Sequence, residues 1–195
     1  MPSGSDEPLR GSRIQRLSRF WGRLVLLGIV FLIVVILSLI KVTPFAVYQN
    51  PKFGIQIKYP DYWRILEYPE GVEAIVFISP PEDEDDQFFE NVNITKKPVP
   101  PNKRRMEYFT EDAIRQLRGV FDENIEILQS RSMSIAERPG HILIFKGTSP
   151  EPVKYMHAWF ISGDTAYIIT YTAMERDFDH YFRDALDMVK SVRLL

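Results

Sequence analysis

Hydrophobic and polar positions alternate in short runs through most of the chain after residue 50, which is the pattern of strands with one buried face. In the clearest run, FGIQIKY over 53–59, every second residue is apolar, and Pro60 should end the strand. The last two runs flank Ser162-Gly163-Asp164 and predict a hairpin. Further strands are predicted over 63–67, 74–79, 91–96, 125–135, 141–148, 153–161 and 165–173.

Two segments have helical rather than alternating periodicity, at about 110–121 and 176–191. Thr110 is the predicted N-cap of the first, because acidic residues follow it. The proline-rich stretch 96–105 is predicted to be irregular. Strand 165–173 is apolar on both faces, so both need cover. We therefore predict an α+β fold, an antiparallel sheet in an α/β/α sandwich.

Two large aromatic residues, Tyr62 and Trp63, follow one residue after the proline that ends the first strand. They could line a reactive pocket, or they could pack the corner of the sheet together with Tyr59. Large aromatic side chains chiefly supply buried area, which favours the packing interpretation.

A run of 17 uncharged and mostly apolar residues separates Arg23 from Lys41. As a helix it would cover about 25 Å, close to the thickness of the hydrocarbon core. A cleaved signal peptide is the alternative, although its apolar region is usually shorter. A lipoprotein anchor is excluded because the chain has no cysteine. The predicted division is a basic tail (1–19), one transmembrane helix (20–41), a linker (42–50) and an exported domain (51–195).

The charge of the chain is divided between its two parts. Residues 1–41 have a net charge of +4 and residues 42–195 a net charge of −6. Positive charge stays on the cytoplasmic or stromal side, so we expect the C-terminal domain in a periplasm or thylakoid lumen. An acidic domain also argues against nucleic acid as a partner. The arginines that set this orientation are Arg10, Arg13, Arg16, Arg19 and Arg23.

Catalytic motifs do not occur in the sequence. It contains no G-x-S-x-G nucleophile turn, no phosphate-binding glycine loop, and no H-E-x-x-H pair among its three histidines. His157 is interpreted as a core or edge histidine. We therefore expect a protein that is not an enzyme.

Two charged segments are candidate sites. The basic one could dock electrostatically on an acidic partner or simply keep a loop soluble; it consists of Lys96, Lys97, Lys103, Arg104 and Arg105. The acidic one could bind Ca²⁺ or Mn²⁺ weakly or be a solvated loop, and no other cofactor is expected. Its proposed ligands are Asp83, Asp85, Asp86 and Glu90.

The opening YQNPKFGIQIKYPDYW over 48–63 resembles the start of PsbP-type domains, where a first strand ends in a Tyr-Pro-x-x-Trp corner. The segments NVN (91–93), AYIITYTA (166–173) and VKSVRLL (189–195) are also similar to that family. The family includes the PsbP subunit of photosystem II and bacterial DcrB-like lipoproteins. The resemblance implies a three-layer sandwich that docks on membrane protein complexes, here with a transmembrane helix in place of an acylated cysteine.

Two functions follow as expectations. The first is a non-enzymatic, membrane-tethered accessory or assembly protein of a larger membrane complex, such as a photosystem. The alternative is an envelope sensor or carrier that binds a ligand or a metal ion, as the DcrB-like branch of the resemblance suggests.

Overall fold

The computed structural model describes residues 29–32, 35, 43–67, 74–82, 84, 86, 88–121, 124–147 and 152–195. The chain divides into two compact units, 1–42 and 43–195, and residues 29–32 and 35 of the first are helical. In the described residues, no helix has the length and apolar character needed to cross a membrane. Most of the span predicted at 20–41, and all of the tail predicted at 1–19, lie outside the described residues.

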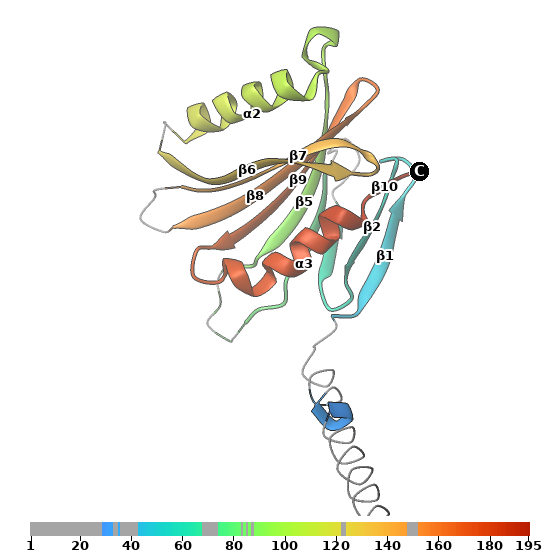
Figure 1. Ribbon diagram of the computed structural model, residues 1–195, viewed down its shortest axis with the longest axis vertical. Coiled ribbons are helices and arrows are strands. Elements are labelled where there is room, and N and C mark those ends of the chain that lie inside the picture. The colour runs from blue at the N-terminus through green and yellow to red at the C-terminus, as the bar shows by residue number, and fades with distance from the viewer. Residues whose placement is uncertain are drawn as a thin grey trace, which may run out of the picture. The chain divides into compact units, whose positions relative to one another are not determined.

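A large antiparallel sheet forms the centre of the second unit (Figure 1). Its strands are β3 (Arg64–Glu67), β4 (Ala74–Ile78), β5 (Asn91–Pro98), β6 (Ile125–Ile135), β7 (Arg138–Gly147), β8 (Val153–Ser162) and β9 (Thr165–Met174). Their order across the sheet is β3-β4-β5-β9-β8-β7-β6. The hairpin predicted around Gly163 is confirmed as β8 and β9, and this glycine has a φ of 64° in the turn.

The first predicted strand does not belong to this sheet. It forms β2 (Ile55–Pro60), which pairs with β1 (Phe45–Asn50) and with β10 (Arg193–Leu194) in a smaller antiparallel sheet. The segment expected to be a linker over 42–50 is therefore mostly strand. The prolines at positions 44 and 51 bound β1 rather than break a linker, and Phe45 and Tyr48 pack against the core.

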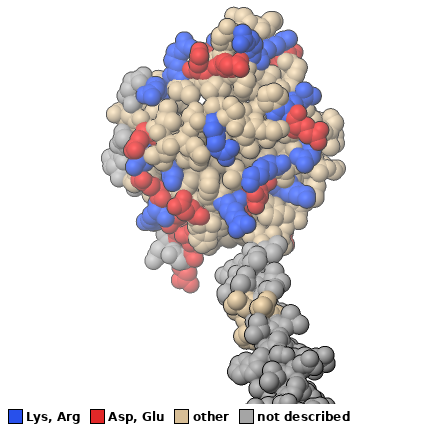
Figure 2. All heavy atoms as spheres, viewed as in Figure 1, with Lys and Arg blue, Asp and Glu red and all other residues tan. Residues whose placement is uncertain are grey.

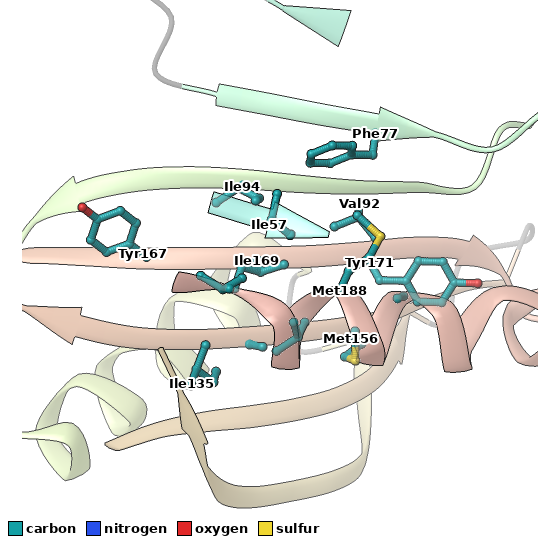
Figure 3. Close-up of a cluster of buried hydrophobic side chains, with 14 of the residues drawn as sticks. Ile57, Phe77, Val92, Ile94, Ile135, Met156, Tyr167, Ile169, Tyr171 and Met188 are labelled. Carbon is teal, nitrogen blue, oxygen red and sulfur yellow. The ribbon is translucent and has the colours of Figure 1, made fainter. Parts of the chain in front are cut away.

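One face of the large sheet is covered by helix α3 (Phe178–Ser191) together with the smaller sheet. Figure 3 shows this core, in which Ile57 of β2 and Met188 of α3 lie against Ile169 of β9. All three side chains have an exposed fraction of 0%. The apolar residues of the alternating pattern therefore lie in one continuous buried core.

The opposite face is covered by helix α2 (Met106–Val120), whose Phe109 packs with Phe145 and Trp159 in a second core cluster. The helix begins four residues before the predicted N-cap. Thr110 lies inside it and accepts a hydrogen bond from Trp159 Nε1 at 3.2 Å. The stretch predicted to be irregular is partly regular as well, because β5 continues to Pro98 and a 3₁₀ helix, η1, spans Pro101–Lys103.

The predicted α+β class is thus observed, with antiparallel sheets and helices on both faces of the larger one. The addition is the small sheet beside α3. It exists because a strand near the start of the unit pairs with the last residues of the chain.

Candidate functional site

The predicted basic segment does not form one patch. Lys96 and Lys97 are consecutive in β5, so they point to opposite faces of the sheet. Lys96 Nζ lies 4.4 Å from the centre of the Phe53 ring on the α3 side. Lys97 Nζ lies 5.1 Å from the centre of the Phe109 ring on the α2 side. Only Lys97 therefore shares a face with the rest of the segment.

The remaining part of the segment is held in a fixed shape. Lys103 Nζ is 2.9 Å from Asp112 Oδ2, and this contact lowers the pKa of the Asp112 carboxyl. Arg104 Nε donates to the Val99 carbonyl at 3.2 Å, and the Val99 N–H donates to the Asp164 carbonyl at 2.6 Å. Lys103 and Arg104 therefore build the loop, which leaves less of their charge for a partner.

Arg105 and Tyr108 form the exposed part of this region. The Arg105 guanidinium lies 4.9 Å from the centre of the Tyr108 ring, and its Nε is 3.5 Å from Glu107. The Arg105 side chain is 69% exposed and Tyr108 is 48% exposed. Figure 2 shows basic and acidic side chains interspersed on the face it displays, so charge alone does not mark out a docking surface there. The Arg105–Tyr108 pair is distinguished instead by an aromatic ring and a guanidinium that are both exposed.

The acidic segment differs from its prediction in one residue. Glu90 is 1% exposed and does not lie in a solvated loop. Its carboxyl accepts a hydrogen bond from Ser79 Oγ at 3.4 Å, and its carbonyl accepts one from the Ser79 N–H at 2.8 Å. Burial raises the pKa of Glu90, and the nearby carboxylates of Glu82 and Asp86 act in the same direction.

Asp86 caps its own loop, because its two oxygens accept hydrogen bonds from the backbone N–H groups of Glu82 and Phe88, each at 3.0 Å. Asp83 and Asp85 lie outside the described residues. Over the described ranges, no three His, Cys, Asp or Glu residues are grouped so that they could hold a metal ion.

The packing interpretation is confirmed for Trp63, which is buried against α3, and holds in part for Tyr59 and Tyr62. Trp63 is 3% exposed and meets the Tyr181 ring edge-on with ring centres 5.5 Å apart. Tyr59 lies against Phe77 with ring centres 5.1 Å apart. Tyr62 is the outermost and donates a hydrogen bond to Asp184 Oδ2 at 2.9 Å. Burial and this carboxylate raise the pKa of Tyr62 to about 12.

A groove between α2 and the large sheet is a site that sequence reasoning missed. Its volume is about 190 Å³. His157 meets the Phe145 ring edge-on at 5.1 Å, and burial lowers the pKa of its imidazole to about 4. The lining residues are Lys97, Phe109, Ala113, Gln116, Leu117, Val120, His157, Trp159 and Ile168.

The sequence alone could not predict this groove. His157 lies between Tyr155 and Trp159 on an apolar strand face, which marks it as unusual, whereas Lys97 continues the polar face of Asn93 and Thr95. Nothing in the sequence gives the order β5-β9-β8 that brings Lys97 and His157 together. That order follows from long-range pairing.

Comparison with known proteins gives no family by sequence, since no family model and no curated protein matches the chain. Structural similarity is clear. The solution structure of cyanobacterial PsbP (CyanoP) from Synechocystis sp. PCC 6803 matches with a TM-score of 0.59 at 13% identity, covering 80% of this chain and 95% of that one.

Two further solved structures share the architecture. The Ran-binding protein Mog1p of Saccharomyces cerevisiae matches with a TM-score of 0.55 at 11% identity, over 78% of this chain and 96% of its own. LpqN of Mycobacterium tuberculosis, involved in cell envelope biogenesis, matches with a TM-score of 0.51 at 11% identity, over 77% and 90%. The chain therefore shares the α+β fold of PsbP-like and Mog1-like proteins.

Proposed function

We propose that the protein is a non-enzymatic accessory or assembly factor that is tethered to a membrane and docks on a larger membrane complex. The observation that carries this proposal is the exposed Arg105–Tyr108 pair at the start of α2, directly after a loop that hydrogen bonds hold in place. Arginine and tyrosine are the residue types that most often carry binding energy at protein interfaces.

The loop that precedes the pair is ordered before any partner binds. Three prolines lie between residues 98 and 101, and the Lys103–Asp112 and Arg104–Val99 contacts fix the path of the backbone. A surface that is ordered before it binds loses less conformational entropy on association. Such a loop suits recognition of an acidic, partly apolar patch on a partner protein.

The tether makes weak docking effective, because confinement to a membrane raises the local concentration of both partners. The 17-residue apolar run supports the tether, and the similarity to a cyanobacterial PsbP supports a photosystem as the complex. We propose that it is a single-pass membrane protein whose C-terminal domain lies in a thylakoid lumen or periplasm. The acidic domain is not expected to bind nucleic acid.

Co-purification tests the proposal. Gently solubilised membranes containing the tagged full chain are passed over an affinity column, and retained proteins are identified by mass spectrometry. We expect subunits of one membrane complex to be retained, and rising salt to release them, because exposed charges are screened beyond about 8 Å at physiological ionic strength.

The variant Arg105→Glu with Tyr108→Ala should lose these subunits while the protein keeps its melting temperature, since both side chains are exposed. Arg131→Glu is the matched control, because Arg131 is exposed on β6, away from the loop. Retention of the complex by the double variant, or its loss only in the Arg131 variant, would refute this docking surface.

A further inference from the structure

The groove beside α2 arises from a mismatch of widths. Strands in a sheet are spaced by about 4.8 Å, so the seven-stranded sheet is far wider than a helix of about 10 Å diameter. The cluster under α2 is formed by residues of β7 and β8, such as Leu143, Phe145 and Trp159. The same face of the sheet is less covered towards β9 and β5, and the groove lies at this border.

Strand register shows the border directly. His157 of β8 is paired with Thr170 of β9, which is paired with Asn93 of β5. One row further along, Trp159 is paired with Ile168, which is paired with Thr95. An aromatic and apolar half of the sheet thus meets a half that carries Asn and Thr. A ligand at this border would contact both kinds of surface.

Lys97 provides positive charge at the groove. Its Nζ is 3.5 Å from Gln116 Oε1 and lies near the Phe109 ring, and in the described part of the chain no carboxylate pairs with it. The nearest acidic side chain of α2, Asp112, is occupied by Lys103 and Arg115. Lys97 also lines two adjoining hollows, of about 180 and 270 Å³. An anionic group can therefore reach this ammonium from solvent.

His157 provides a polar group without charge. Its ring packs against Phe145 and Tyr155, and no described residue hydrogen-bonds its nitrogens. Because burial lowers the pKa of His157, the imidazole is neutral at physiological pH and can donate one hydrogen bond or accept one. The side chain is half-buried and lines the groove, so a ligand in the groove can reach its ring nitrogens.

We propose that this groove binds a small organic carboxylate, with an apolar body against Phe109, Leu117 and Trp159 and its carboxylate at Lys97. The body is one ring or a short hydrocarbon chain, because a cavity of about 150 Å³ accommodates benzene and this groove measures about 190 Å³. An inorganic anion would leave the apolar lining unused. A sugar would bury its hydroxyl groups against that lining without enough partners.

Titration of the full chain in lipid nanodiscs with benzoate tests the proposal, followed by ligand-observed NMR with empty nanodiscs as background. Benzamide is the neutral counterpart of the same shape. We expect benzoate to bind more tightly than benzamide. Lys97→Gln should weaken benzoate about tenfold, the usual effect of losing one charge-assisted hydrogen bond, and leave benzamide unchanged.

Two further variants complete the design. Ala113→Leu places a larger side chain in the groove and should abolish binding of both probes; Ala113 lies on α2, where leucine is well tolerated. Lys58→Gln is the control, because Lys58 is exposed on β2 and does not line the groove. Melting curves establish that each variant is folded.

The proposal is overturned if benzoate does not bind, or if folded Lys97→Gln binds it as tightly as the parent protein. It is also overturned if the protein is a dimer that Ala113→Leu dissociates while neither probe binds, since the groove would then hold a second copy. It is supported if Lys97→Gln, but not Lys58→Gln, weakens benzoate about tenfold and leaves benzamide unchanged, and if Ala113→Leu abolishes binding of both probes.

Discussion

At the scale of the residue, Trp63 shows what local sequence can predict. A proline after an alternating strand, followed by two large aromatic residues, predicted a packed corner, and the structure buries Trp63 against Tyr181 of α3. The signal was sufficient because the proline and the aromatics are adjacent in the chain. The local sequence could not predict which ring Trp63 contacts, because Tyr181 is more than a hundred residues away in the chain.

Trp63→Ala should therefore act on stability. Truncation of a buried tryptophan to alanine costs about 3–5 kcal/mol, a large share of a total of about 5–15 kcal/mol. Denaturant unfolding of the wild type and the variant measures this loss. A variant that unfolds like the wild type but no longer binds its partner complex would instead make Trp63 a binding residue.

Glu90 shows the opposite case. Its position at the end of an acidic run predicted a solvated or metal-binding carboxylate, yet it is buried beside Ser79. The burial follows from the start of β5 and could not be seen in composition. Because its folded pKa is raised, the folded state keeps a proton that the unfolded state loses above its ordinary pKa of about 4.3. Stability therefore falls as the pH rises through this window.

Glu90→Gln should remove this dependence. We expect a melting temperature about 2–4 °C higher than wild type at pH 8, with the difference shrinking as the pH falls towards 4. His157 has a lowered pKa, so its own contribution is lost as the pH falls from about 6.5 to about 4, and this effect is common to both proteins. Differential scanning calorimetry from pH 4 to 8 measures the difference.

The same pair of proteins tests the metal-binding alternative. Ca²⁺ or Mn²⁺ should shift neither melting temperature if the acidic loop is only solvated. Stabilisation of the wild type by either ion, but not of Glu90→Gln, would favour an envelope metal carrier over a docking protein.

At the scale of the element, the turn between β6 and β7 lies two residues from where it was predicted. The sequence predicts a turn over Glu137-Arg138-Pro139-Gly140, between the strands predicted at 125–135 and 141–148. In the structure Ala136 and Glu137 form the turn, with φ of 50° and 60°. Gly140 lies in β7, where an added Cβ would be 2.8 Å from the Trp159 carbonyl oxygen. This glycine permits close strand approach rather than a turn.

Two glycine substitutions should therefore have opposite effects. Glu137→Gly should stabilise the protein by about 0.5–1 kcal/mol, because a left-handed conformation is unfavourable for a side chain with a Cβ. Gly140→Ala should destabilise it by about 1–3 kcal/mol through overpacking against β8. Urea unfolding of both variants measures the pair. A destabilised Glu137→Gly would mean that the Glu137 side chain contributes contacts that offset this strain.

The basic segment shows at this same scale what sequence proximity cannot predict. Sequence proximity suggested that Lys96, Lys97 and Lys103 act together, but pairing of β5 with β9 continues to Pro98 and sends the two consecutive lysines to opposite faces. Where a strand ends depends on its neighbour. The five basic residues, which are close in the sequence, therefore do not all lie on one surface of the protein.

At the scale of the whole molecule, alternation and helical periodicity were sufficient for the α+β class and for helices on both faces. They did not predict the small sheet, since β2 pairs with residues at the far end of the chain. They also did not predict the groove, which depends on strand order and on the position of α2.

The proposed orientation in the membrane can be tested because the chain has no cysteine. Single cysteines at Ser5 and Ser132 give two reporters; Ser132 is exposed on β6, and Ser5 precedes the arginines. A membrane-impermeant maleimide should label Ser132→Cys in intact spheroplasts, and Ser5→Cys only after lysis, because positive charge stays inside. The reverse pattern would show that the domain is not exported.

The pairing of β10 with β2 also has a consequence for the timing of folding. Residues 55–56 find their partners only when residues 193–194 have been synthesised, and Leu195 adds a hydrogen bond to the Gly54 carbonyl at 3.0 Å. At usual translation rates this delay is on the order of ten seconds, during which Ile55 and Ile57 lack their final cover. Assembly of the small sheet therefore waits for the segment after α3, and a nascent chain that stops before Arg193 cannot complete it.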